Sequence, residues 1–349
     1  MISFYPGPSK LYPRIGQYMQ EAIKEGVLSI NHRSPEFVAI SEKTIKLLKQ
    51  KLSIPKDYWI FFTSSATESW EIIAQSLIKD KSTHLYSGAF GEKWFEYTKN
   101  IKPRAQGIAF EFNKEPEVTS YNGELIGVVQ NETSNGSQVS NKILKKLKEA
   151  NPNSLIAIDA TSSLGGIKID FKNADVCLAS VQKCFGLPAG LGLLICSPNA
   201  IEKAIQLNES AHYNSLTFMI EKMKVGQTTT TPNVLGIYLL MKSLSDTPSI
   251  TETGKIIQQR AKDWYSFIQT LKQVQLLVDR TSTRSDTVIA IKGEENLIAQ
   301  LKKEAKQEGI LLGNGYGKWA KNTFRIANFP SLTEMEIKKL KKLLAKRLK

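Results

Sequence analysis

The chain has 349 residues, of which 41% are hydrophobic and 23% are charged, so it is long enough to bury a sizeable core and is typical of a globular protein of about two domains. Its three cysteines show neither a disulfide-scaffold count nor a metal-binding pair, and no apolar run reaches the length of a membrane span. The net charge is +14. We therefore expect a cytoplasmic protein without a signal peptide or a metal site.

Helical and strand-like segments alternate along the first 245 residues. The patterns predict helices over 37–52, 66–78 and 141–150, and strands over 58–65, 83–90, 154–163, 174–183 and 190–197. Within 124–136 they predict a strand that enters a polar turn. This alternation predicts a mostly parallel sheet covered on both faces by helices, with reactive groups in loops at the carboxyl ends of the strands. Ser64, Asn131, Asp159 and Lys183 fall at such ends.

A change in pattern near residue 245 suggests a domain boundary. Residues 245–254 resemble a linker, and a helix over 255–273, strand-like pieces and a last helix follow. We expect an N-terminal arm over 1–15, a large domain over 16–245 and a smaller α+β domain over 246–349.

The positive charge is concentrated at the carboxyl end of the chain. Residues 301–349 contain 13 Lys or Arg and 4 Asp or Glu, and 331–349 predicts an amphipathic helix. Its apolar positions are Ile337, Leu340, Leu344 and Leu348, and its capping-box candidates are Ser331 with Glu334 or Thr333 with Glu336. A basic face could bind nucleic acid or an anionic membrane. Since no aromatic or arginine-rich surface accompanies it, we expect a solvated helix with neither partner.

Lys183 is the leading catalytic candidate. It lies in ASVQKCFGLPAGLG, 24 positions after Asp159, which ends a buried-looking strand. A lysine in this setting can form a Schiff base with pyridoxal phosphate, and an aspartate can keep the cofactor's pyridine nitrogen protonated. The alternative from this segment alone is an ordinary exposed lysine.

The segment Ser64–Thr67 provides a second candidate feature. It joins a strand to a helix, so its backbone N–H groups and hydroxyls could bind a phosphate. The alternative is an ordinary helix N-cap by Ser or Thr.

Eight segments in sequence order resemble the class V aminotransferases of pyridoxal phosphate fold type I, closest to their phosphoserine aminotransferase branch. They are FYPGPSKLYP, INHRSPEF, SSAT, GAFGEKW, QNETSNG, IDATSSLGG, SVQKCFGLPAGLG and TTTTPNVLGIY. The resemblance implies a homodimer with shared active sites, and a ping-pong transamination between phosphoserine and 2-oxoglutarate through Lys183.

The resemblance also assigns roles to residues. Lys183 would bind the cofactor aldehyde and then transfer protons, while Asp159 would pair with the pyridine nitrogen. Cofactor contacts are implied for Ala66, Thr67, Phe90, Thr133, Gln182, Thr230 and Thr231, with Phe90 stacking on the ring and Thr230 and Thr231 reaching across the dimer. His32, Arg33 and Arg325 are implied in substrate binding, since guanidinium groups suit carboxylates.

One departure from the phosphoserine branch concerns substrate choice. Its members carry a second His-Arg pair in the C-terminal domain, and Asn314 and Gly315 stand at that place here. Lys318 or Lys321 could compensate, although a lysine is a point charge and not a planar fork.

Three other functions remain open on the sequence alone. An alanine– or serine–glyoxylate-type aminotransferase of the same class differs only in substrate. A cysteine desulfurase would need a His before the lysine, where this chain has Gln182, and Cys184 lies directly after the lysine, in the wrong place to attack a substrate. A non-catalytic, basic nucleic-acid-binding protein is the remote alternative.

Overall fold

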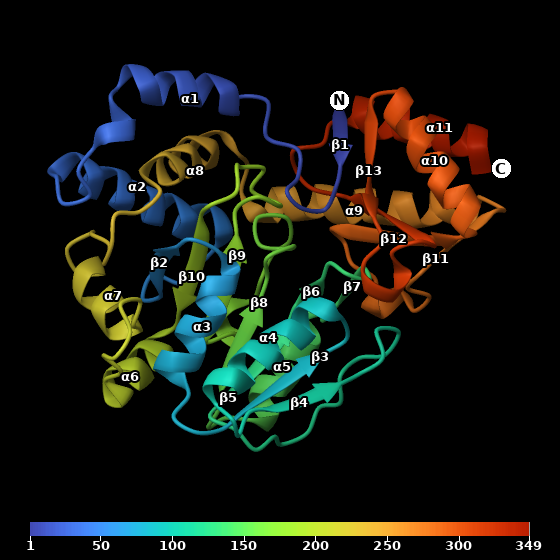
Figure 1. Cartoon of the computed structure of the whole chain (residues 1–349). Helices are drawn as coiled ribbons and strands as arrows, with labels where there is room; N and C mark the ends of the chain where they lie inside the picture. The colour runs from blue at the N-terminus through green and yellow to red at the C-terminus, as the bar shows by residue number, and fades with distance from the viewer. Residues whose placement is uncertain (349) are drawn as a thin grey trace.

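The computed structural model describes residues 1–348. A seven-stranded sheet with the order β2-β10-β9-β8-β5-β3-β4 forms the larger part of the molecule (Figure 1). The strands are β2 (Trp59–Thr63), β3 (Ser82–Tyr86), β4 (Gln106–Ala109), β5 (Leu125–Val129), β8 (Leu155–Asp159), β9 (Val176–Ser180) and β10 (Gly192–Cys196). All neighbours from β9 to β4 are parallel, and only β10 runs antiparallel to β9 and β2. The predicted mostly parallel α/β sheet is confirmed.

Helices cover both faces of this sheet because its central strands are apolar on both sides. Along β8, Ile156 and Ile158 pack into one core cluster, whereas Leu155 and Ala157 pack into the other. The first cluster includes α1 (Ile15–Lys24), α2 (Pro35–Leu52), α5 (Asn141–Ala150) and α8 (Val234–Asp246). The second includes α3 (Ala66–Leu77), α4 (Ala89–Ile101), α6 (Pro198–Leu207) and α7 (Leu216–Met223).

A second, mostly antiparallel sheet has the order β1-β13-β14-β12-β11. It consists of β1 (Ile2–Phe4), β11 (Val274–Leu276), β12 (Val288–Gly293), β13 (Ile310–Asn314) and β14 (Thr323–Ala327), with α9 (Ile250–Gln269), α10 (Glu295–Gln307) and α11 (Glu334–Leu348). Between the sheets lies the hairpin β6 (Asn131–Glu132) and β7 (Ser137–Gln138). Short 3-10 turns occur at Val27–Ser29, Phe171–Asn173, Thr281–Thr283 and Gly317–Trp319.

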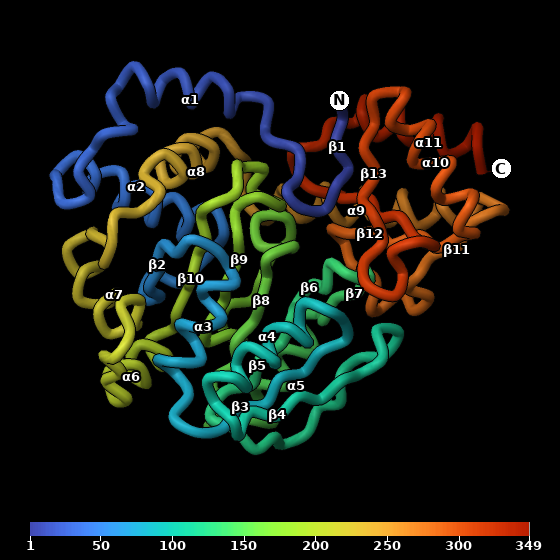
Figure 2. Tube along the Cα trace, viewed as in Figure 1, coloured from blue at the N-terminus to red at the C-terminus, as the bar shows by residue number. Residues whose placement is uncertain are grey.

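The first strand of the chain belongs to the sheet formed by the last third of the chain. Phe4 is fully buried in that core, and β1 pairs in parallel with β13. Figure 2 follows the blue amino-terminal segment from β1 across the molecule to α1. On the way, Ser9 N donates to Gln182 O at 2.9 Å and Tyr12 N donates to Gly186 O at 3.0 Å. The arm is thereby fixed to both sides of Lys183.

Two segment predictions were wrong. The linker-like stretch 245–254 is mostly helical, because Ser249 and Glu252 form a capping box that starts α9 at Ile250. The strand expected over 83–90 ends at Tyr86, and α4 begins at Ala89. Phe90 is therefore helical.

The predicted C-terminal amphipathic helix is confirmed as α11 over Glu334–Leu348, while Lys349 lies outside the described residues. Its four predicted apolar positions are buried. Of the two capping candidates, Thr333 with Glu336 forms the box: Thr333 N donates to Glu336 Oε2 at 2.9 Å, and Glu336 N donates to Thr333 Oγ1 at 3.4 Å. Within residues 1–348, no helix has the length and apolar character needed to cross a bilayer.

Candidate active site

Lys183 lies in the loop after β9 and points into the junction between the two sheets. Its side chain is only 9% exposed. The Nζ atom donates to Pro6 O at 3.0 Å and lies 3.5 Å from Thr133 Oγ1 and 5.6 Å from the centre of the Phe90 ring. Burial first, and then the charge of Arg325, lower the pKa of Lys183 to about 8. A buried lysine with a depressed pKa suits attack on an aldehyde.

Asp159 ends β8, beside β9 in the same sheet. It is 4% exposed, and its carboxylate accepts hydrogen bonds from Trp70 Nε1 at 2.9 Å and Thr161 N at 2.8 Å. Burial raises its pKa, and these donors oppose that shift. The two donors fix the orientation of the carboxylate and leave it capacity for a further donor.

Arg325 reaches the same place from the small sheet. It lies on β14, is 5% exposed, and donates from Nε to Asn314 O and from Nη1 to Thr133 O, both at 2.6 Å. Within residues 1–348, Nη2 has no hydrogen-bond partner, and no carboxylate lies within 4 Å of the guanidinium. The group is thus held by two hydrogen bonds and keeps donor capacity at Nη2 for an anion.

Glu132 holds the helix that carries Phe90. Its buried carboxylate accepts from Gly91 N at 3.1 Å and Phe90 N at 3.4 Å, and from the amide and hydroxyl of Ser134 at 3.0 and 2.5 Å. Burial raises its pKa while these donors favour the charged form. A Cβ at Gly88 would lie 2.5 Å from Glu132 Cγ, so only glycine permits this close approach. The pair therefore fixes the position of Phe90.

The Ser64–Thr67 loop is arranged differently from the expectation. Ser65 caps α3 by accepting from Glu68 N, and Glu68 Oε2 accepts from both the amide and hydroxyl of Ser64, at 2.6 and 2.7 Å. Both hydroxyls are thus used within the loop. Ala66 N donates to Ser180 Oγ at 2.8 Å, at the end of β9. Thr67 stays exposed at the start of α3.

Gln182 lies next to Lys183, and its Oε1 is buried without a hydrogen-bond partner within residues 1–348. Thr161 Oγ1, beside Asp159, is in the same state. Buried polar atoms without partners cost free energy, so a ligand that supplies donors to this place would be bound favourably.

The other four predicted residues form a separate group on the surface. His32 Nδ1 lies 3.3 Å from Thr231 Oγ1, and Arg33 donates to Gln227 Oε1 at 2.9 Å and to Thr229 O at 3.3 Å. Arg33, Thr230 and Thr231 are exposed. No hydrogen bond within residues 1–348 joins this group to Lys183, Asp159 or Arg325.

The site's residues fit pyridoxal phosphate. The buried amine of Lys183 and the buried carboxylate of Asp159 match an aldehyde and a ring nitrogen, and the unpartnered Thr161 hydroxyl can donate to an oxygen of that cofactor. Gly7 also lets the backbone of the amino-terminal arm approach Lys183 closely. Its φ is +152°, and a Cβ there would lie 3.0 Å from Lys183 Nζ. The described residues contain no group of three or more His, Cys, Asp or Glu placed to hold a metal ion.

The absence of a second His-Arg pair at Asn314 and Gly315 has a steric explanation. A Cβ at Gly315 would lie 2.0 Å from Trp319 O, so the tight turn there accepts no larger residue. Asn314 is exposed and donates to Tyr5 Oη at 3.3 Å. Lys318 and Lys321 are exposed, and Lys318 Nζ lies 4.9 Å from the Trp319 ring centre.

Sequence reasoning missed several contributors. Trp70, Glu132 and Pro6 contact the predicted residues directly. The Tyr316 ring lies beside the Phe90 ring, tilted by 37° with ring centres 5.2 Å apart, and the Arg325 guanidinium carbon lies 5.7 Å from its centre. Glu132 directly precedes Thr133 in the QNETSNG segment. Its place beside a predicted cofactor contact was the signal in the sequence that could have identified it.

Comparisons with known proteins identify relatives over the whole chain. The family model "Aminotransferase class-V" matches residues 4–318. A phosphoserine aminotransferase from Corynebacterium glutamicum is 29% identical over 96% of this chain and 91% of its own length. The crystal structure of a phosphoserine aminotransferase from Cytophaga hutchinsonii superposes with a TM-score of 0.96 at 33% identity, covering 100% of this chain and 99% of that chain. An aspartate aminotransferase from Thermus thermophilus shares the fold, with a TM-score of 0.88 at 20% identity and full coverage of both chains.

Proposed function

We propose that this chain, which belongs to the class V aminotransferase family, is a pyridoxal-phosphate-dependent phosphoserine:2-oxoglutarate aminotransferase of serine biosynthesis. The observation that carries the proposal is the buried Lys183, with a pKa near 8, beside the buried Asp159. The phosphoserine aminotransferases among the relatives supply the substrate class.

When bound, pyridoxal phosphate supplies an aldehyde that links covalently to amines and a ring that accepts the electron pair left when a substrate Cα–H bond breaks. Lys183 would hold that aldehyde carbon at rest, and Asp159 would keep a proton on the ring nitrogen. Thr133 Oγ1 would donate to the ring's phenolic oxygen, and Phe90 would stack on the ring. Ala66, Thr67 and Gln182 would contact the phosphate.

Lys183 would transfer protons because its Nζ lies among Pro6, Thr133 and Phe90 of the site. A pKa near 8 leaves about a tenth of the amine neutral at pH 7, so the same atom can accept a proton from the substrate's Cα and return it. Arg325 would bind the substrate α-carboxylate through the donors that its two hydrogen bonds leave free. Amino donor and amino acceptor use this site in turn, which is a ping-pong route.

The surface group of half-buried His32 and exposed Arg33, Thr230 and Thr231 supports a homodimer. We assign Thr230 and Thr231 to the cofactor phosphate, and His32 and Arg33 to the substrate, of a second copy of the chain. Exposure of residues with these roles, and their separation from Lys183 within one chain, support the assignment.

Subunit mixing tests the shared site. We expect the Lys183→Ala homodimer to be inactive and the Arg33→Ala homodimer to be impaired. A hybrid dimer combines the intact Lys183 of one chain with the intact Arg33 of the other. Recovery of activity on mixing supports sharing, and no recovery in a verified hybrid contradicts it.

Half-reactions test the substrate. The enzyme with bound pyridoxal phosphate is mixed separately with phosphoserine, glutamate, serine and alanine, and loss of the cofactor's visible absorbance is followed. Fast reaction with phosphoserine and glutamate supports the proposal. Fast reaction with serine or alanine, but not with phosphoserine, assigns the chain to the glyoxylate-type branch instead.

A further inference from the structure

Tyr316 occupies the place next to the reacting groups that no role above explains. Its ring lies 5.2 Å from the Phe90 ring and 5.7 Å from the Arg325 guanidinium carbon, while Phe90 lies 5.6 Å from Lys183 Nζ. A substrate with its α-carboxylate on Arg325 and its amine at the Lys183 site therefore has Tyr316 as a neighbour. Whatever extends from the substrate's Cα on that side meets this ring.

Lys93 places a positive charge at the far edge of Tyr316. It lies one turn after Phe90 on α4, so the two residues share a helix face. Its Nζ donates to Tyr316 Oη at 3.2 Å and lies 5.8 Å from the ring centre. The ammonium and the hydroxyl together form a two-point donor for an anion.

Three positively charged side chains lie near Tyr316. Within residues 1–348, Lys93, Lys318 and Arg325 make no ion pair within 4 Å, although twelve such pairs occur elsewhere in the chain. A cavity of about 340 Å³ lined by Tyr316, Lys318, Gly88 and Trp319 adjoins them. Exposed Glu92 also lines this cavity, as its one acidic side chain. Lys93 and Arg325 do not line the cavity but lie over the Tyr316 ring, and cations without ion pairs around one side chain favour a nearby anion.

We propose that Lys93 and the Tyr316 hydroxyl bind the anionic distal group of the amino-acid and oxo-acid substrates and so determine side-chain specificity. The inference rests on the proposed transaminase function and deepens it. Both partners of the exchange, a phosphate monoester and a five-carbon dicarboxylate, carry an anion at the end opposite the α-carboxylate. One cation–hydroxyl pair can therefore serve both halves of the reaction in place of an arginine at the sterically closed Gly315.

Variants of one helix test this proposal. Lys93→Met removes the charge and keeps the aliphatic stem, and Tyr316→Phe removes only the hydroxyl. Lys99→Met is the matched control, because Lys99 lies on the same helix with its Nζ over another ring, Phe95, at 5.5 Å. Single-turnover kcat/KM is measured for each variant with phosphoserine, glutamate and alanine.

Lys93→Met is expected to lower kcat/KM for phosphoserine about 10- to 100-fold, and for glutamate by a smaller factor, because a hydrogen bond to a charged group is lost. Tyr316→Phe should lower both about 3- to 10-fold. Alanine has no distal anion, so its kcat/KM should stay within about twofold. Lys99→Met should change none of the three, and the absorption spectrum of the bound cofactor should be unchanged in all variants.

Three results would overturn the inference. An equal loss with alanine would mean that Lys93 acts on the fold of the site and not on the distal group. Unchanged phosphoserine kinetics in Lys93→Met would place the anion elsewhere while leaving the proposed function intact. A wild-type enzyme that reacts with none of the three amino acids would remove the proposed function, and this inference with it.

Discussion

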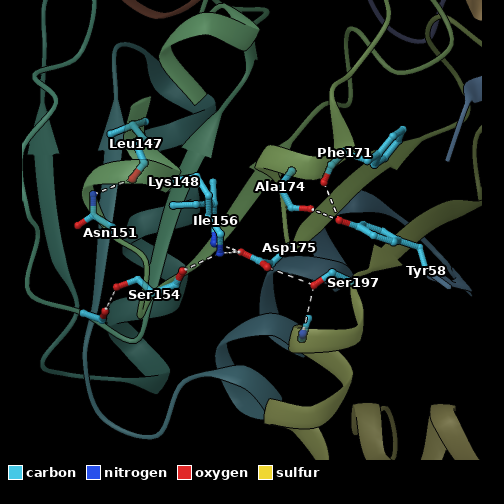
Figure 3. Close-up of polar contacts among 12 residues, drawn as sticks. Tyr58, Leu147, Lys148, Asn151, Ser154, Ile156, Phe171, Ala174, Asp175 and Ser197 are labelled. Carbon is cyan, nitrogen blue, oxygen red and sulfur yellow. Dashed lines mark hydrogen bonds and ion pairs between the residues drawn. The ribbon is translucent and has the colours of Figure 1, made fainter. Parts of the chain in front are cut away.

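The two ends of the large sheet each bury an aspartate to the same extent, but the two aspartates have different hydrogen-bond donors. Asp159 at the carboxyl end and Asp175 at the amino end are both 4% exposed. Asp175 binds Lys148 Nζ at 2.6 Å, Ile156 N at 2.8 Å and Ser197 Oγ at 3.2 Å (Figure 3). Asp159 receives only neutral donors, from Trp70 and Thr161.

The surroundings differ in the same sense. Around Asp175, Tyr58 Oη donates to Phe171 O at 2.6 Å and Ser154 Oγ to Gly123 O at 2.6 Å, so the polar atoms there are paired (Figure 3). At the other end Gln182 Oε1 and Thr161 Oγ1 have no partner within residues 1–348, and Lys183 makes no ion pair there. The amino end is arranged for stability, and the carboxyl end keeps capacity for a ligand.

The strongest test of this contrast is Asp159→Asn. The amide cannot stabilise a protonated ring nitrogen, so we expect kcat to fall about 10²- to 10³-fold, as for other preorganised electrostatic groups. Trp70 donates to Oδ2 and Thr161 to Oδ1, so only one of them can still donate to the amide oxygen. We therefore expect a loss of about 1 kcal/mol in the free energy of unfolding, small beside the loss of kcat. Steady-state kinetics measure kcat, and calorimetry measures stability. A large loss of stability with a normal kcat would contradict the assignment of the carboxyl end of the sheet to ligand binding.

Asp175→Asn should give the opposite pattern. It removes the charge that pairs with Lys148, whose side chain is 23% exposed, and we expect a loss of about 2 kcal/mol in the free energy of unfolding. Denaturant unfolding measures this loss. The kcat of the folded fraction should be unchanged, and a fall in kcat would show that the two ends are coupled.

Glu132→Gln should weaken the support of Phe90. The amide directs a donor at the amides of Phe90, Gly91 or Ser134 that the carboxylate now accepts. We expect about a tenfold loss of kcat and a changed circular dichroism of the bound cofactor. Glu71→Gln, at an exposed position of α3, is the control and should behave as wild type.

The smallest expected effect is a pH shift. Burial and the Arg325 charge hold the pKa of Lys183 near 8, so the rate of pyridoxal phosphate capture by the cofactor-free protein should rise with pH through about 8 as the amine deprotonates. Arg325→Gln removes a positive charge that disfavours the protonated amine, and the midpoint should move upward. A downward shift, or none, would contradict the assigned proximity.

Much of this site was predictable because parallel strands bring their carboxyl ends to one edge. Asp159 and Lys183 follow adjacent strands, so their strand assignment alone placed them together. The prediction that Phe90 lies in a strand failed because Gly88 and the donors to Glu132 start a helix there. Ser249 and Glu252 carried a readable capping signature inside the stretch taken for a linker.

The contacts that could not be predicted join distant segments. Pro6 lies 177 positions from Lys183, and Lys93 lies 223 positions from Tyr316. Their meeting depends on the packing of β1 into the small sheet and on the placement of that sheet over α4, neither of which has a local signature. Local patterns therefore identified the lysine and the aspartate, and tertiary packing determined the residues around them.

Reductive trapping tests the central claim most directly. The purified enzyme is incubated with pyridoxal phosphate, treated with borohydride, digested and analysed by mass spectrometry, with Lys183→Ala in parallel. The account predicts one modified peptide, carrying the cofactor on Lys183, and none in the variant. Modification of another lysine, or equal modification of the variant, would contradict it.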